Sequence, residues 1–153
     1  MNYSVDSSSL IHLARLHPAD LFVSLWAKLD ESFASGMFRV SEEVYKELCK
    51  GTDDLAGWLK ARPQCMVATD TNIESHVQAI MKSHPTLVQI DLQKSGADPY
   101  VIAVAIQNTF RVLTQERPKK PTSTRPKIPD VCESYSVDCF DFVDMARTEG
   151  WRL

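Results

Sequence analysis

The sequence predicts a three-layer α/β fold, in which a central, mostly parallel sheet is flanked by helices. Short β-prone runs alternate along the chain with stretches whose apolar residues recur at helical spacing. The 153 residues suit a single domain spanning 1–153. Hydrophobic residues make up 44% and charged residues 24%, close to the averages of about 45–50% and about 25% for soluble globular proteins.

The amino-terminal part begins with a predicted strand and two predicted helices. A β pattern over residues 2–5 ends at Asp6, and the hydroxyls of residues 7–9 offer N-caps to a helix that residues 17–18 interrupt. An apolar stripe over residues 21–33 then predicts a long amphipathic helix. Asp6 is therefore expected at the carboxyl end of the first strand.

The middle of the chain continues the alternation. Residues 37–40 form a brief extended link, Ser41 is a good N-cap, and residues 42–50 have the pattern of a helix that Gly51 closes. Further elements expected here are a helix over 53–61, a strand over 65–68 and a helix over 71–84.

The last part supplies a buried helix and two more strands. Asp98 and Pro99 form a helix start, and residues 100–107 are apolar on nearly every side, which is typical of a helix buried in a core. Residues 109–113 are strongly β-prone, and Glu116 follows shortly after their end. The remaining elements expected are a helical turn over 130–134, a strand over 136–139 and a helix over 140–150.

A basic, proline-rich loop is predicted at 117–129, where four of the eight prolines lie. The charge of residues 117–127 is +5, so that the remainder of the chain carries −8 within a net charge of −3. The cations of this loop are Arg117, Lys119, Lys120, Arg125 and Lys127. Such a loop is suited to RNA phosphates, to an acidic partner or to a solvated connection, and its charge alone does not choose among them.

Four acidic residues are expected to meet at one edge of the sheet. Asp6 and Glu116 follow separate strands, while Glu47 and Asp98 come from helices that face the same edge. Clustered carboxylates repel one another unless a cation compensates them, and Mg²⁺ or Mn²⁺ suits an all-oxygen ligand set. The four cysteines contain no C-x-x-C pair, so no zinc ribbon competes with this interpretation.

The segments around these acids resemble a known family. In order along the chain they read Val5-Asp6-Ser7-Ser8-Ser9-Leu10-Ile11, Val44-Tyr45-Lys46-Glu47-Leu48, Ala97-Asp98-Pro99-Tyr100-Val101-Ile102-Ala103-Val104-Ala105 and Val112-Leu113-Thr114-Gln115-Glu116. They are similar to the four acidic motifs of PIN-domain nucleases. The match covers most of the chain and resembles a bacterial PIN-like family of unknown function, related to the toxins of toxin–antitoxin pairs.

This resemblance implies a role for each acid. The metal-binding and catalytic carboxylates would be Asp6, Glu47, Asp98 and Glu116. Glu116 holds the fourth position, where Asp is more usual, and Asp130 is an alternative to it. Glu43 is the alternative to Glu47 if the helix is rotated. Ser8 and Thr114 match positions that support the acidic cluster through hydrogen bonds.

The expected function is that of a cytoplasmic, metal-dependent endoribonuclease with one or two bound ions and with RNA phosphates on the cations of the loop. The resemblance further implies a toxin that forms a homodimer and is blocked by a cognate antitoxin protein. A catalytically inactive PIN-like module that binds RNA or protein is one alternative, and a DNA nuclease or phosphatase with the same acidic pocket is another. No secretion signal or membrane span is expected, because the start lacks a basic segment and a long apolar run.

Overall fold

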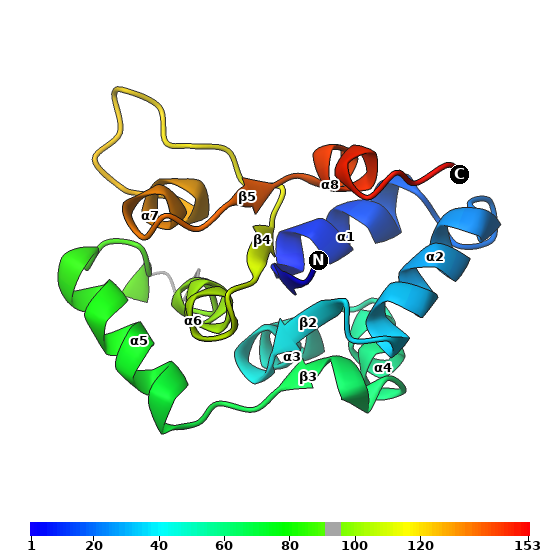
Figure 1. Cartoon of the computed structure of the whole chain (residues 1–153), viewed down its shortest axis with the longest axis horizontal. Helices are drawn as coiled ribbons and strands as arrows, with labels where there is room; N and C mark the ends of the chain where they lie inside the picture. Colours follow the sequence, from blue (N-terminus) through cyan, green and yellow to red (C-terminus); the bar gives the residue numbers. More distant parts are fainter. Residues whose placement is uncertain (91–95) are drawn as a thin grey trace.

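The fold is a parallel α/β sheet flanked by helices, as the computed structural model of the chain shows for residues 1–90 and 96–153 (Figure 1). Five strands pair in the order β3-β2-β1-β4-β5, and every pairing is parallel. The strands are β1 (Tyr3–Val5), β2 (Phe38–Ser41), β3 (Met66–Val67), β4 (Arg111–Leu113) and β5 (Cys139–Phe140). The predicted fold class is confirmed.

Helices lie on both faces of the sheet. In Figure 1, α5, α6 and α7 lie on one side of the strands, while α2 and α8 lie on the other. The α-helices are α1 (Ser7–Leu16), α2 (Val23–Ala34), α3 (Glu42–Cys49), α4 (Leu55–Lys60), α5 (Thr71–Ser83), α6 (Asp98–Asn108), α7 (Ile128–Ser134) and α8 (Phe142–Thr148). A short 3-10 helix, η1 (Pro63–Cys65), precedes β3. This arrangement gives the three layers that the sequence predicts.

The strand order reverses between β1 and β4. From β1 the chain moves outward to β2 and then β3, after which it returns to the other side of β1 to add β4 and β5. In open parallel sheets such a reversal leaves a crevice at the carboxyl ends of the two central strands, and ligands bind there. Asp6 and Thr114 are the residues that directly follow β1 and β4.

The central helix α6 is buried, as its composition predicts. Residues 101–105 are almost fully shielded from solvent. Ser4, in the middle of β1, donates a hydrogen bond from Oγ to the carbonyl oxygen of Val101 at 2.7 Å. This bond satisfies a hydroxyl that would otherwise be costly to bury, and it fixes the first turns of α6 against β1.

The tryptophans belong to the packing of the molecule, as their predicted helical and terminal contexts suggest. The rings of Trp26 and Trp58 meet edge to face with centroids 5.6 Å apart, and Phe33 packs against Trp58 at 5.2 Å. Trp151 lies against Phe38 at 6.1 Å. Edge-to-face pairs of this kind stabilise a core beyond their buried area.

Two predicted strand boundaries are wrong, and backbone geometry explains both. The strand predicted at 109–113 begins only at Arg111, because Thr109 has φ 57° and ends α6 in the left-handed conformation. The strand predicted at 136–139 shares only Cys139 with β5, and Ser136 cannot begin a strand because it also has positive φ (55°). Such residues interrupt an extended strand, and sequence periodicity does not reveal them.

The basic loop is also shorter than the predicted 117–129. Ile128 and Pro129 form the first turn of α7, so that the loop ends at Lys127. The cause lies in two acids, since Glu116 accepts a hydrogen bond from the backbone N–H of Ile128 and Asp130 accepts one from that of Lys127. These carboxylates satisfy amides at the start of the helix that have no partner within it.

Within the described part of the chain, no helix has both the length and the apolar composition needed to cross a membrane.

Candidate carboxylate site at the sheet edge

Asp6 is the buried centre of the candidate site. It directly follows β1, and only 2% of its surface is exposed. Its Oδ2 accepts hydrogen bonds from Ser8 Oγ at 2.6 Å and from Thr114 Oγ1 at 2.8 Å, and the two hydroxyls lie 3.2 Å apart. Three residues from the ends of β1 and β4 therefore form one buried polar cluster at the switch point of the sheet.

The serines that follow Asp6 serve this cluster rather than cap the helix. Asp6 itself is the N-cap residue of α1, and no side-chain cap bond is formed there. Ser8 Oγ donates to Asp6, and Ser7 Oγ donates to Glu47 Oε2 at 2.7 Å. The prediction that these hydroxyls cap the helix is thus wrong for Ser7 and Ser8, because α1 already begins at Ser7 and both residues lie inside its first turn, past the N-cap position.

Glu47 reaches the site from α3. Its hydrogen bond from Ser7 joins the start of α1 to the last turns of α3, across 40 positions of sequence. Burial is the largest cause that raises the pKa of Asp6, and the negative charge of Glu47 raises it further because the two carboxylates repel one another. Ser7 was not among the predicted site residues, although its place directly after a strand-terminal acid is a signal that sequence reading can use.

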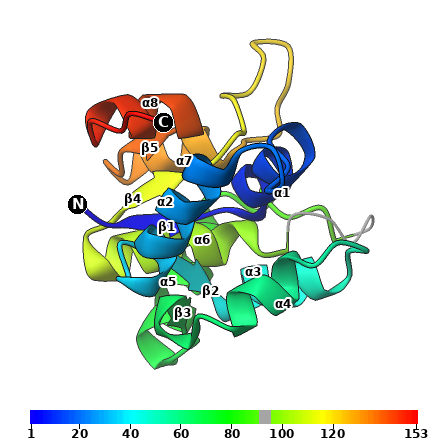
Figure 2. The same ribbon diagram turned by 90° about the vertical axis from the view of Figure 1, so that its right-hand side faces the viewer.

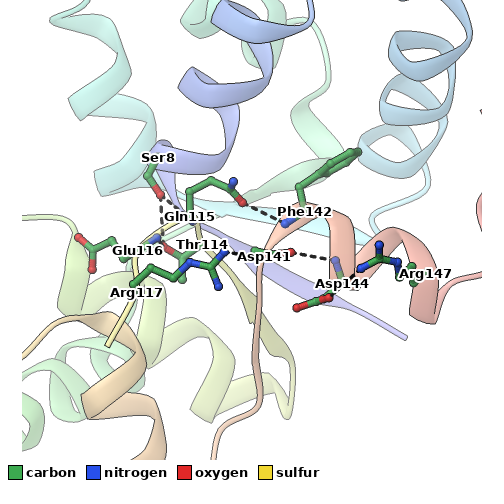
Figure 3. Close-up of polar contacts among 9 residues, drawn as sticks. All are labelled: Ser8, Thr114, Gln115, Glu116, Arg117, Asp141, Phe142, Asp144 and Arg147. Carbon is green, nitrogen blue, oxygen red and sulfur yellow. Dashed lines mark hydrogen bonds and ion pairs between the residues drawn. The ribbon is translucent and has the colours of Figure 1, made fainter. Parts of the chain in front are cut away.

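Glu116 lies at the same edge, two residues beyond Thr114. Its backbone N–H donates to Thr114 Oγ1 at 3.1 Å, and its Oε2 accepts from the backbone N–H of Ile128 at 3.0 Å. In Figure 3 the side chains of Gln115 and Glu116 point to opposite sides of this segment. Gln115 accordingly bonds the start of α8, through Oε1 and the N–H of Phe142 at 3.0 Å.

The site carries more negative charge than its surroundings neutralise. Burial is the main cause that raises the pKa of Asp6, and the hydrogen bonds from Ser8 and Thr114 act against it. Burial also raises the pKa of Glu116, and the charge of Asp6 raises it further. The amide of Ile128 and the charge of Lys127 lower it. Both acids are therefore held in a field that opposes their ionisation.

Asp98 is the buried acid at the start of α6. It is the first residue of that helix, and only 5% of its surface is exposed. Val101, one turn further on, is tied to β1 through the hydroxyl of Ser4. A carboxylate at this end of a helix also lies at the positive end of the helix dipole.

The two alternative acids have other partners. Asp130 Oδ2 accepts the backbone N–H of Lys119 at 2.9 Å and that of Lys127 at 2.8 Å, and so closes the base of the basic loop. Glu43 forms an ion pair with Lys46 at 2.9 Å on the surface of α3. The structure thus links Glu47 and Glu116 to the Asp6 cluster through hydroxyls and charge, and it gives Asp130 and Glu43 different contacts.

Two cations of the loop, Arg125 and Lys127, act on the site. The loop rises near the start of α1, at the edge where β1 ends (Figure 2). Arg117 Nη2 contacts Asp141 Oδ2 at 3.1 Å (Figure 3), and Arg125 Nη2 donates to the carbonyl of Leu87 at 3.0 Å. The charges of Lys127 and Arg125 both act on Glu116, so that the loop and the acids share one electrostatic environment.

The chemistry of these donors suits a hard divalent cation that keeps some of its water. Among residues 1–90 and 96–153, no three or more His, Cys, Asp or Glu side chains form a ready set of metal ligands. Mg²⁺ commonly binds through one or two carboxylates and completes its shell with water. The mutual repulsion of Asp6, Glu47 and Glu116 is the feature that such an ion would relieve.

Fold and site together define a parallel α/β protein that gathers carboxylates at the switch point of its sheet. Residues 3–153 match the family model described as "Domain of unknown function (DUF4411)", and the chain belongs to this family. Comparison with curated proteins and with solved structures found no match.

Proposed function

We propose that this protein is a metal-dependent nuclease of the PIN-like type that hydrolyses RNA phosphodiester bonds. The observation that carries the proposal is the buried carboxylate of Asp6 at the switch point, held by Ser8 and Thr114 and repelled by Glu47 and Glu116. A protein that retains such an unfavourable cluster has a use for negative charge at this position, and functional sites are where perturbed acids gather.

Each residue of the site has a part in this proposal. Asp6, Glu47, Asp98 and Glu116 would hold one or two Mg²⁺ or Mn²⁺ ions. When bound, such an ion activates a water molecule and stabilises charge on the phosphate. Ser8 and Thr114 keep the Asp6 carboxylate in one orientation, and Ser7 does the same for Glu47.

The basic loop supports a polyanionic substrate. An acidic site repels RNA, and the charge of +5 over residues 117–127 offsets that repulsion next to Glu116. Contacts of this kind hold a phosphate backbone without reading its sequence. The self-pairing and the antitoxin partner implied by the resemblance stay predictions.

Cleavage of a mixed, structured RNA by the purified protein tests the proposal. The reaction is run with Mn²⁺, with Mg²⁺ and with chelator, and with the variants Asp6→Asn and Asp98→Asn at matched folding. Asp20→Asn, at an exposed position outside the site, is the control for the same chemical change. We expect cleavage in wild type and control, and loss of cleavage with chelator and in both site variants.

Two outcomes would replace the proposal by its alternatives. Folded wild type that binds RNA but cleaves nothing with any metal would identify a non-catalytic binding module. A panel of RNA, single-stranded DNA and phosphomonoesters separates the remaining possibilities, because carboxylate–metal chemistry does not by itself select RNA. Preference for DNA or for phosphomonoesters would identify a DNA nuclease or a phosphatase.

A further inference from the structure

The basic loop encloses a pocket of its own, separate from the buried acids. The pocket has a volume of about 390 Å³, at the lower end of the range of roughly 300–1,000 Å³ that small-molecule sites occupy. None of the acidic residues in the described part of the chain lines it, whereas four cationic and two hydroxyl residues do. These residues are Arg117, Lys119, Lys120, Lys127, Thr122 and Ser123.

The loop is held in this shape by contacts at its base. Oδ2 of Asp130 accepts the backbone amides of Lys119 and Lys127, which lie on either side of the pocket. Within the loop, Lys119 Nζ donates to the carbonyl oxygen of Ser123 at 3.1 Å. The prolines add stiffness, since each removes backbone freedom from the unfolded chain. The pocket is therefore formed before any ligand arrives.

The charge of the pocket indicates what kind of anion it suits. Arg117 has a partner in Asp141, and the three lysines add further positive charge around the same space. A phosphodiester carries one negative charge, whereas a terminal phosphate group carries about −1.5 to −2 at neutral pH and offers more acceptor oxygens. The positive charge of this loop, with the hydroxyl residues Thr122 and Ser123 beside it, thus favours the phosphomonoester.

We propose that this pocket binds a terminal phosphomonoester, and that Asp130 is the positioning residue that keeps the loop in its binding conformation. The identity of the polymer, RNA, rests on the proposed function, while the phosphate site itself does not. In this assignment the protein would engage an RNA strand by its phosphorylated end. Lys127 lines the pocket and its charge also acts on Glu116, so it relates the two sites.

Binding is measured in chelator, so that no cleavage takes place and failure of the nuclease proposal does not affect the result. Fluorescence anisotropy compares one labelled single-stranded RNA with a 5′-phosphate, with a 3′-phosphate and with hydroxyls at both ends. Inorganic phosphate and a nucleoside monophosphate are used as competitors. We expect one phosphorylated end to increase affinity about tenfold, the effect of one added charged hydrogen bond.

Lysine substitutions test whether the pocket causes the preference for a phosphorylated end. Lys119→Gln with Lys120→Gln should abolish the preference for the phosphorylated end. Lys50→Gln with Lys60→Gln makes the same change of charge at two exposed positions, directly after α3 and at the end of α4, and should leave it intact. Equal affinity for phosphorylated and unphosphorylated RNA in wild type would overturn the proposal. Displacement by the mononucleotide at equal affinity would support the phosphomonoester site and identify a free nucleotide as its ligand.

Substitution of Asp130 separates the effect of its charge from the effect of its hydrogen bonds to the loop, because the two predict opposite changes in the affinity for phosphate. Removal of a negative charge beside a cationic pocket should strengthen anion binding if Asp130 acts only through its charge. We expect Asp130→Ala to weaken phosphate-dependent binding instead, because both loop amides lose their acceptor. Asp130→Asn keeps an acceptor oxygen and should restore the preference. Tighter binding in Asp130→Ala would overturn the positioning role, and circular dichroism verifies that each variant is folded.

Discussion

Thr114 donates a hydrogen bond to Asp6 at 2.8 Å, although the two residues lie 108 positions apart in the chain. The contact exists because β1 and β4 are neighbours in the sheet, with Val5 in register with Leu113. Each residue is the first to follow its strand, so the parallel pairing brings the hydroxyl and the carboxylate to the same edge. The site is thus a product of strand order.

Removal of the Thr114 hydroxyl should destabilise the fold. Thr114→Val keeps the shape of the side chain but leaves Asp6 with one hydroxyl donor fewer in a buried position. A hydrogen bond to a charged group contributes about 1.5–3 kcal/mol, and we expect a loss of that order in the free energy of unfolding, measured by urea denaturation. Thr148→Val, at an exposed position of α8, is the matched control. Equal stability of the two variants would show that the contact contributes nothing.

Asp6 should make the protein less stable as pH rises. Its pKa is raised in the fold above the ordinary value of 3.8, so the native state binds more protons than the unfolded chain between these two values. The stability contributed by Asp6 is therefore greatest below pH 3.8 and declines until the raised pKa is passed. Urea denaturation over a pH series in chelator should show a smaller decline for Asp6→Asn than for wild type. An identical slope for both proteins would contradict the raised pKa.

A divalent cation should stabilise the native protein against heat. Binding to the folded state alone raises stability by mass action, and it also relieves the repulsion between Asp6 and Glu47. We expect the melting temperature of wild type to rise with added Mg²⁺ or Mn²⁺, and to stay constant for the double variant Asp6→Asn with Asp98→Asn. A matched concentration of Na⁺ controls for ionic strength. The same rise in both proteins would place the ion elsewhere.

Glu47 and Glu43 should differ in their effect on cleavage, although they lie one turn apart on α3. Glu47 bonds Ser7 and acts on Asp6, whereas Glu43 pairs with Lys46 at the surface. Glu47→Gln should therefore lower the rate of RNA cleavage at least about a hundredfold, as loss of a group that fixes a catalytic metal does. Glu43→Gln should leave the rate within about twofold of wild type, an ordinary result for a surface change. The reverse order of effects would assign the site to Glu43.

The cysteines should react with alkylating agents in the order of their exposure. Cys49 is exposed, while Cys65 and Cys132 are buried. Burial raises the pKa of Cys65 to about 11, and the thiol of Cys139 together with burial raises that of Cys132. Because the thiolate is the reactive form, mass spectrometry after brief treatment with N-ethylmaleimide should find Cys49 modified first. Early modification of Cys132 in the folded protein would show that the region around α7 opens.

Local pattern was enough to predict much of the fold. The apolar run of α6, the stripe of α2 and the N-cap at Ser41 are short-range signals, and the structure contains each of them. Ser41 Oγ indeed accepts the backbone N–H of Glu43 at 3.2 Å. The predicted strand boundaries were wrong where one residue has a left-handed conformation, at Thr109 and Ser136, because neither residue type by itself predicts a positive φ.

The sequence by itself determined the class of fold and the acids that end its strands, since both follow from periodicity and from residues adjacent in the chain. Only the tertiary structure decided which groups meet: Ser7 with Glu47, Thr114 with Asp6, and Asp130 with the two ends of the basic loop. These partners come from different elements. Their contacts depend on strand order and on which hydroxyl donors the fold brings within reach of a buried carboxylate.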